Sequence, residues 1–288
     1  MNTTILIAGA AGSTGRVATA QLLEKGFAVR ALVRRQDARA EKLQALGAEI
    51  VVADLLDFRA VRRAFDGAQR GYFVYPMRPG LLEATANFAQ AALDTRAEVI
   101  VNMSQRTARP DAISTSALQH WMSERLFDRS GVPAVHLRPT AFAEWFLYMR
   151  NMVRAGRYGV PFDPEGRFAT VAAEDLGRVA AAVLAEPAAH LGQTYPLYGP
   201  EELSPPELAA IASQVLGREI RYERITAEQW VQEVAGQEIP FLAQHLNGIT
   251  EDHRQGMMAG TNDIIERLTG RKPMSVAAFV EQHRAAFE

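Results

Sequence analysis

Three glycines near the start of the chain have the spacing of a loop that holds phosphate groups. The apolar run Ile5–Ala8 leads into Gly9, Gly12 and Gly15, spaced G-x-x-G-x-x-G, and a helical pattern follows at once. We expect Gly9 to allow a tight exit from the strand, Gly12 to leave room for phosphates, and Gly15 to permit close helix packing. The N–H groups of the first helical turn, aided by the helix dipole, would then face the pyrophosphate of a dinucleotide. The expected binding loop consists of Gly9, Ala11, Gly12, Ser13, Thr14 and Gly15.

The context of these glycines separates them from an ordinary turn. A helical pattern over 13–25 stops before Gly26, and the apolar run Ala28–Val33 follows as a second strand. This strand–helix–strand unit has the size that a dinucleotide-binding fingerprint needs. The glycine spacing is one residue wider than G-x-G-x-x-G and resembles the form used by the short-chain dehydrogenase/reductase superfamily.

The end of the second strand favours NADP(H) over NAD(H). An NAD site places an Asp or Glu about twenty residues after the loop, on the ribose 2′-hydroxyl. Here the strand ends in Arg34 and Arg35, and the first acid is Asp37. A guanidinium pairs bidentately with a 2′-phosphate, which a carboxylate would repel. The alternative is that both arginines only solvate the strand end.

Further apolar runs alternate with helical patterns, which predicts an α/β fold with a doubly wound parallel Rossmann sheet. Asp54 follows the third strand, where it either accepts from the adenine amino group or caps the next turn. The remaining expected strands are Ile50–Ala53, Gly71–Tyr75, Val99–Met103, Ala134–Leu137 and Thr194–Tyr198; the expected helices are Arg39–Leu46, Phe58–Phe65, Leu81–Leu93, Ala117–Arg129 and Glu174–Leu184.

The alternation loosens in the second half of the chain. A helical pattern over 142–153 is broken by the glycine- and proline-containing stretch 156–161, and the chain becomes mostly helical after Gly199. We therefore expect an NADP-binding Rossmann domain over 1–199 and a small, mostly helical C-terminal lobe over 200–288 that covers the substrate. The segment 154–173 is open to either part.

Composition narrows the class of protein. The 288 residues are 48% hydrophobic and 22% charged, with a net charge of −2 and no cysteine. This is ordinary for a globular protein, offers no field that favours nucleic acid or anionic membrane, and excludes disulfides, thiolate catalysis and cysteine-based zinc sites. Without a signal peptide or an apolar run of membrane-spanning length, we expect a cytoplasmic protein. Whether it is a monomer or a homodimer stays open.

One short acidic segment looks like a metal site at first. Glu251, Asp252 and His253 are adjacent, but adjacent residues on a helix point apart, so we interpret them as a solvated turn and expect no metal. No G-x-S-x-G segment occurs, so serine hydrolysis has no support either.

Taken together, the motifs resemble those of the NmrA-like group of atypical short-chain dehydrogenase/reductases, over nearly the whole chain. The resemblance implies a Rossmann fold, NADP(H), and one of two roles: reduction of quinones, dyes and azo compounds, or redox sensing by a regulator that binds the nucleotide without turnover. It also places Tyr75, Pro76, Asn102, Met103, Ser104, Pro139, Thr140 and Phe142 beside the cofactor. Besides the glycine loop, the matching motifs are Arg34, Asp54, Tyr75-Pro76-Met77, Asn102-Met103-Ser104, Ser130–Pro133, Leu137–Phe142, Ala173–Gly177 and Leu268–Arg271.

The chain departs from the superfamily at the catalytic pair. Most members use Tyr-x-x-x-Lys, whereas Ser116 and His120 occupy these positions here. Some quinone-reducing relatives resemble this histidine substitution, which implies that His120 binds the nicotinamide ribose or donates a proton to the acceptor. An acid of unperturbed pKa would titrate near pH 6.5. The alternatives are that His120 is only a polar residue at the helix start and that Ser116 is the helix N-cap.

The absence of the Tyr/Lys pair indicates the class of acceptor. Reducing an isolated ketone makes a strongly basic alkoxide, whereas a reduced quinone carries a phenol-like oxygen with a pKa of about 10, which water or histidine can protonate. We therefore expect an NADPH-dependent oxidoreductase that transfers hydride to a quinone-like or other conjugated small molecule, and the alternative is the redox-sensing regulator. The expected substrate-lining residues, which are otherwise plain core, are Trp145, Phe146, Tyr148 and Met149.

Overall fold

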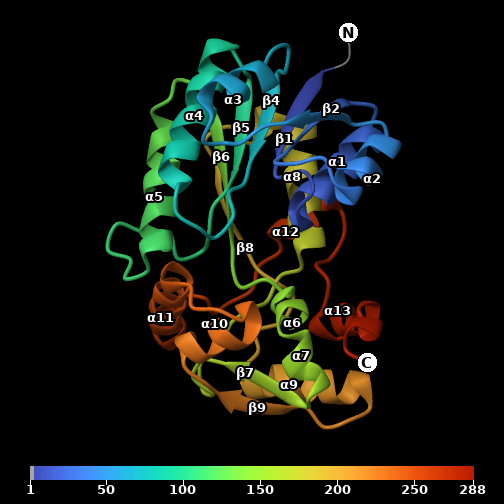
Figure 1. Cartoon of the computed structure of the whole chain (residues 1–288), viewed down its shortest axis with the longest axis vertical. Coiled ribbons are helices and arrows are strands. Elements are labelled where there is room, and N and C mark those ends of the chain that lie inside the picture. Colours follow the sequence, from blue (N-terminus) through green and yellow to red (C-terminus); the bar gives the residue numbers. More distant parts are fainter. Residues whose placement is uncertain (1–2) are drawn as a thin grey trace. The chain divides into compact units, whose positions relative to one another are not determined.

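The computed structural model describes residues 3–288 and divides into two compact units, shown in Figure 1. Of the described residues, the first unit contains 3–105, 119–138 and 174–195, and the second contains 106–118, 139–173 and 196–288. The C-terminal part of the second unit begins close to the expected boundary at 200. The second unit also takes in 106–118 and all of 139–173, whereas the sequence left only 154–173 open.

A seven-stranded sheet with the order β3-β2-β1-β4-β5-β6-β8 forms the centre of the Rossmann fold. The pairings of β1 with β2 and β4, of β2 with β3, and of β5 with β4 and β6 are parallel. The strand order reverses between β1 and β4, which is the point where open α/β sheets bind ligands outside their carboxyl ends. The strands are β1 (Thr4–Ala8), β2 (Ala28–Val33), β3 (Glu49–Val52), β4 (Arg70–Phe73), β5 (Val99–Met103), β6 (Ala134–Pro139) and β8 (Thr194–Leu197).

Helices cover both faces of this sheet, as Figure 1 shows, with α1, α2 and α8 on one side and α3, α4 and α5 on the other. The doubly wound prediction is therefore confirmed, with strand and helix ends within two residues of the expected positions. The helices are α1 (Ser13–Glu24), α2 (Ala38–Ala45), α3 (Phe58–Ala64), α4 (Leu81–Asp94), α5 (Thr115–Asp128) and α8 (Ala173–Ala185).

Close contacts hold α1 in place at its first turn. The Thr14 hydroxyl lies 2.8 Å from the Tyr72 hydroxyl on β4, and both side chains are buried. On α8, a Cβ added to Gly177 would lie 2.7 Å from the Thr14 carbonyl oxygen and 2.6 Å from the Val17 Cβ. Only glycine allows α8 to approach α1 this closely, so the start of α1 is fixed from two sides.

The second unit has its own apolar core and a small parallel sheet. Aromatic rings dominate the core, with Phe146 stacked on Tyr158 at 4.9 Å and Trp145 stacked on Phe162 at 5.4 Å. Its elements are α6 (Trp145–Tyr148), α7 (Arg150–Arg154), β7 (Arg157–Val160), α9 (Pro205–Leu216), β9 (Arg221–Arg224), α10 (Ala227–Ala235), α11 (Pro240–Arg254), α12 (Ile264–Thr269) and α13 (Val276–Gln282).

The structure differs from the expected pattern in this region at two points. The stretch 156–161 does end the helical pattern, since α7 stops at Arg154, but it also contains the strand β7, which pairs with β9 in parallel register. Its partner lies more than sixty residues further along the chain, so local pattern did not reveal it. The helical pattern over 142–153 is two short helices that meet at Met149, whose ψ of +14° leaves the helical range.

Candidate functional site

The glycine loop has the geometry of a phosphate cradle. Gly9 has a φ of +62°, and its Cβ would lie 2.7 Å from the Val74 side chain, so a tight exit from β1 needs glycine here. A Cβ on Gly15 would lie 2.4 Å from the Gly9 carbonyl oxygen, so the first turn of α1 is pressed against the loop itself. Gly12 is the N-cap of α1 and supplies no side-chain cap, which leaves the amides of that turn open to an anion.

Strand register brings the expected cofactor residues to one edge of the sheet. Ala8 pairs with Leu32, and Val33 pairs with Val52, so the loop after β1, Arg34 after β2 and Asp54 after β3 follow three adjacent strands. Tyr75 and Pro76 follow β4, which pairs with the other side of β1. All of these residues therefore follow the carboxyl ends of strands beside the reversal of strand order.

The two arginines after β2 differ in their surroundings. Both are exposed. Arg35 lies 3.5 Å from Asp37, whose carboxylate also accepts from Arg39 and from two backbone N–H groups at the start of α2. Bonding to Arg39 lowers the pKa of Asp37 strongly. The Arg34 side chain makes no hydrogen bond or ion pair with any other residue of 3–288, so it is the freer of the two cations.

Asp54 and the Tyr75–Pro76 segment are held by local contacts. The Asp54 carboxylate accepts from the Leu56 N–H at 3.0 Å, which is the turn-capping role that the sequence left open. The Tyr75 hydroxyl donates to the Pro79 carbonyl at 3.0 Å, and the Arg78 guanidinium lies 5.3 Å from the Tyr75 ring centre. These contacts fix the loop after β4, while an adenine contact by Asp54 stays a prediction.

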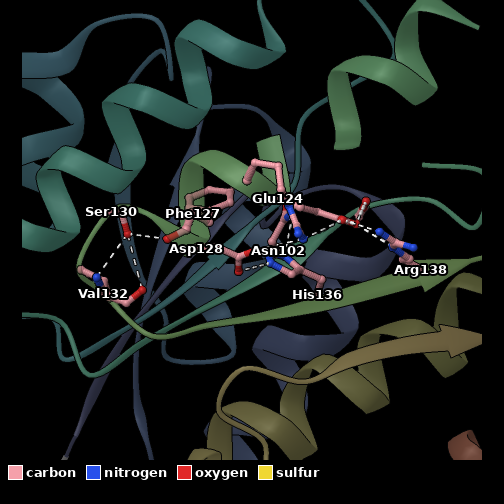
Figure 2. A network of polar contacts seen from close by, with 10 residues as sticks. Asn102, Glu124, Phe127, Asp128, Ser130, Val132, His136 and Arg138 are labelled. Carbon is pink, nitrogen blue, oxygen red and sulfur yellow. Dashed lines mark hydrogen bonds and ion pairs between the residues drawn. The ribbon is translucent and has the colours of Figure 1, made fainter. Parts of the chain in front are cut away.

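Asn102 near the end of β5 and Ser104 directly after it direct their side chains into a polar network, shown in part in Figure 2. The Asn102 amide lies 3.1 Å from Nδ1 of His136, whose Nε2 lies 2.9 Å from Asp128. Ser104 donates to Glu124 at 2.6 Å. Glu124 was not among the expected site residues, and the one signal for it in the sequence is its position one helical turn after His120.

His120 lies on α5 in the first unit and is 8% exposed. Its Nδ1 is buried and has no partner among the described residues. Burial lowers the pKa of His120 to about 4, although Glu124 opposes this shift. The imidazole is therefore neutral near pH 7, which corrects the expectation of a titration near pH 6.5.

Ser116 is not the cap of α5. Ser114 fills that role, because its hydroxyl accepts from the Ala117 N–H at 3.1 Å and also lies 2.8 Å from Nδ1 of His245. Ser116 is one residue inside the helix, buried at 2% exposure. Ser116 belongs to the second unit and His120 to the first. The two residues are four apart on α5, and no contact between their side chains follows from this.

The other expected site residues, from Pro139 at the end of β6 to Met149, all belong to the second unit. The Thr140 hydroxyl donates to the Ala169 carbonyl, and Phe142 forms an isolated bridge with Val171. Phe146 and Met149 are each 1% exposed in the core, which favours their packing role. Trp145 is half-buried and Tyr148 is 51% exposed, so these two remain the better candidates to contact a substrate.

The acidic segment at the end of α11 is not a solvated turn. Asp252 and His253 are both fully buried, and Asp252 pairs with Arg109 at 2.6 Å. The His253 ring packs against Phe162 and Phe168, and the Gly166 backbone lies beside it. The charge and adjacency of these residues suggested that they are exposed to solvent. Packing of α11 in the second unit buries Asp252 and His253 instead. In residues 3–288, no three acidic or histidine side chains form a metal-binding group.

The buried His253 predicts a loss of stability in mild acid. Burial lowers its pKa from 6.5 to about 4. Between these pH values the unfolded chain binds the proton and the folded chain does not, so the free energy of unfolding should fall as the pH falls from 6.5 to 4. Replacing His253 with leucine should flatten this dependence, which urea unfolding at several pH values would measure. An unchanged slope would contradict the assignment of a neutral, buried imidazole.

Comparison with known proteins gives the family. The NmrA-like family model matches residues 1–276. The chain belongs to the NmrA-like family. It is 31% identical over 287 residues to an NAD(P)H azoreductase of Xenophilus azovorans, covering 98% of this chain and 99% of the relative.

Solved structures agree on the fold. A triphenylmethane reductase from Citrobacter sp. superposes with a TM-score of 0.84 at 25% identity, covering 99% of both chains. The NADPH-dependent quinone oxidoreductase QOR2 from Escherichia coli, complexed with NADPH, gives a TM-score of 0.84 at 23% identity, covering 97% of this chain and 99% of the other. Within the described residues, no helix combines the length and the apolar character needed to cross a bilayer.

Proposed function

We propose that this chain is an NADPH-dependent oxidoreductase that transfers hydride to a quinone-like, azo or other conjugated small molecule. The observation that carries the proposal is the uncapped start of α1 beside the unpaired Arg34, at the reversal of strand order. The family relatives support it, since one of them is an NAD(P)H azoreductase.

The residues present fit NADPH. Glycines at 9, 12 and 15 keep side chains out of the loop, and added Cβ atoms there would lie 2.4 to 3.1 Å from neighbouring atoms. The amides of Ser13 and Thr14 would bind the pyrophosphate, and Arg34 would bind the 2′-phosphate. Asp54, Tyr75 and Pro76 would border the adenosine half.

NADPH supplies the hydride when it is bound, and the protein supplies binding and orientation. A quinone takes up one hydride and one proton to become a hydroquinone, so the site must place the acceptor and allow that proton to arrive. The neutral His120 cannot act as a standing cationic acid near pH 7, but a ring N–H can donate a hydrogen bond to the ribose or the acceptor. Water then provides the proton to a phenol-like oxygen.

Aromatic side chains of the second unit suit a planar acceptor. The Trp145 ring stacks on Phe162 and lies 5.3 Å from the Trp230 ring, so it is held rigidly while one part stays accessible. Tyr148 presents an exposed ring three residues further on. We propose Trp145 and Tyr148 as substrate-contacting residues.

The role of His120 is tested by replacing it with alanine. Turnover of a quinone should fall by ~10²-fold, because a positioned hydrogen-bond donor is lost, while NADPH affinity falls less. The wild-type rate should be flat between pH 6 and 8, since the pKa of His120 lies at about 4. Single-turnover hydride transfer measures both, with His190→Ala as the control, because His190 pairs with Tyr195 instead. A wild-type rate that falls through pH 6.5 would contradict the neutral imidazole.

A further inference from the structure

We propose that Glu124 is a positioning residue that sets the placement of His120 for hydride transfer, through a clamp between the ends of β5 and β6. The proposal rests on the proposed function for its kinetic consequence, and it makes a structural claim that can be tested without turnover.

The clamp consists of one carboxylate and three donors. The Ser104 hydroxyl and Arg138 Nε donate to Oε1 of Glu124 at 2.6 and 2.8 Å, and Arg138 Nη2 donates to Oε2 at 2.5 Å. Glu124 is fully buried. Its hydrogen bonds raise the pKa of Arg138. Figure 2 shows the Glu124 and Arg138 side chains facing each other. Such a bidentate pair fixes direction as well as distance.

The three residues of the clamp, Ser104, Glu124 and Arg138, come from three separate parts of the first unit. Ser104 directly follows β5 in the segment expected to border the cofactor, Arg138 lies near the end of β6, and Glu124 lies on α5. The Ser104 N–H also donates to the Leu137 carbonyl at 2.8 Å, so the two strand ends are already tied together. Glu124 therefore attaches α5 to a rigid point at the carboxyl edge of the sheet.

His120 lies on the same helix four residues before Glu124, so the two side chains share a face. The His120 ring makes no hydrogen bond of its own within the described structure, and its Nδ1 is buried. With no hydrogen bond to hold it, the imidazole depends for its position on packing and on how α5 is seated. Glu124, one helical turn further along α5, anchors that seating through its bonds to Ser104 and Arg138.

The buried Glu124–Arg138 pair is not well explained by a contribution to the stability of the fold alone. Burying a carboxylate and a guanidinium carries a desolvation cost that their attraction only roughly offsets, so apolar residues of similar size often serve a core as well. What the pair supplies that apolar residues do not is direction. A misplacement of about 1 Å at a reacting group can lower a rate by ~10²-fold.

The kinetic test is a double-mutant cycle with Glu124→Gln and His120→Ala. Glutamine keeps the size of the side chain but removes the charge that holds Arg138. We expect single-turnover hydride transfer to fall by roughly 10- to 100-fold in Glu124→Gln, with little change in NADPH affinity. In the His120→Ala background the same change should cause no further loss, because Glu124 acts through His120. Equal losses in both backgrounds, or none in either, would overturn the proposal.

The matched control is Glu98→Gln, the same chemical change at another carboxylate of the first unit that bonds an arginine. Glu98 accepts from Arg70 Nε at 2.9 Å, before β5 and at the amino edge of the sheet. Its replacement should leave hydride transfer near the wild-type rate. If Glu124→Gln does not fold, Arg138→Lys keeps the charge but loses the bidentate geometry. It should show a smaller loss that again disappears in the His120→Ala background, and a loss that persists there would overturn the proposal.

A second readout needs no substrate. The imidazole resonances of His120 near pH 7, identified by their disappearance in His120→Ala, should shift in Glu124→Gln and Arg138→Lys but not in Glu98→Gln. An unchanged His120 signal in Glu124→Gln would overturn the proposal even if the chain proved to have no reductase activity. A shifted signal in a protein without turnover would instead contradict only the proposed function.

Discussion

Replacing Gly12 with valine is expected to weaken binding of both NADPH and NADH by about 100-fold or more, equivalent to ~2.7 kcal/mol, while the fold survives. Gly12 has a φ of −81°, which any residue adopts, so its backbone does not require glycine. Its Cβ would lie 3.1 Å from the Gly9 carbonyl oxygen, and the valine methyl groups would occupy the space before the open amides of α1. Titration calorimetry with each dinucleotide measures the loss.

Gly15→Ala is the informative contrast to this variant. Its Cβ would meet backbone atoms at 2.4 and 2.9 Å, so the loop itself must shift and the thermal unfolding temperature should fall as well. Gly12→Val should lose dinucleotide binding while its thermal unfolding temperature falls less than that of Gly15→Ala. Wild-type affinity in folded Gly12→Val would contradict the placement of the pyrophosphate at this loop.

Replacing Arg34 with alanine is expected to weaken NADPH binding by about 1.5–3 kcal/mol, the typical effect of a lost hydrogen bond to a charged group. That corresponds to about 10- to 150-fold in the dissociation constant. NADH affinity should barely change, because NADH lacks the 2′-phosphate. Titration calorimetry of NADPH and NADH with the wild type and with Arg34→Ala gives the four dissociation constants that this comparison needs.

Arg35→Ala separates the two arginines. The Arg35 guanidinium is already shared with Asp37, so its loss should weaken NADPH binding less than the loss of Arg34. If wild type bound NADPH and NADH equally well, or if Arg34→Ala weakened both by the same factor, these arginines would only solvate the strand end.

The sequence was sufficient for the parts of the fold that depend on local pattern. Continuous apolar runs between helical patterns predicted the parallel sheet, and the glycine spacing predicted a loop whose Gly9 has the left-handed φ of +62°. Once the parallel sheet is predicted, β2 and β3 are expected to be neighbours, so Arg34 and Asp54 are expected after adjacent strand ends, where the structure places them. These inferences need only nearest neighbours along the chain or across the sheet.

Features that depend on distant contacts could not be predicted in this way. The strand β7 exists because β9 pairs with it, and Asp252 is buried because Arg109 meets it. The lowered pKa of His120 follows from burial, which no spacing reveals. Glu124 is ordinary in the sequence, and only the ends of β5 and β6 show why a carboxylate is buried there.

The most direct test of the account is acceptor-dependent oxidation of NADPH by the purified protein. Absorbance of NADPH should be followed with a series of quinones, azo dyes and triphenylmethane dyes, beside Gly12→Val as the binding-deficient control. The account predicts rapid oxidation with at least one acceptor, one NADPH consumed per quinone reduced, and no oxidation above background in Gly12→Val. Tight NADPH binding without oxidation by any acceptor would contradict it and favour a nucleotide-sensing protein.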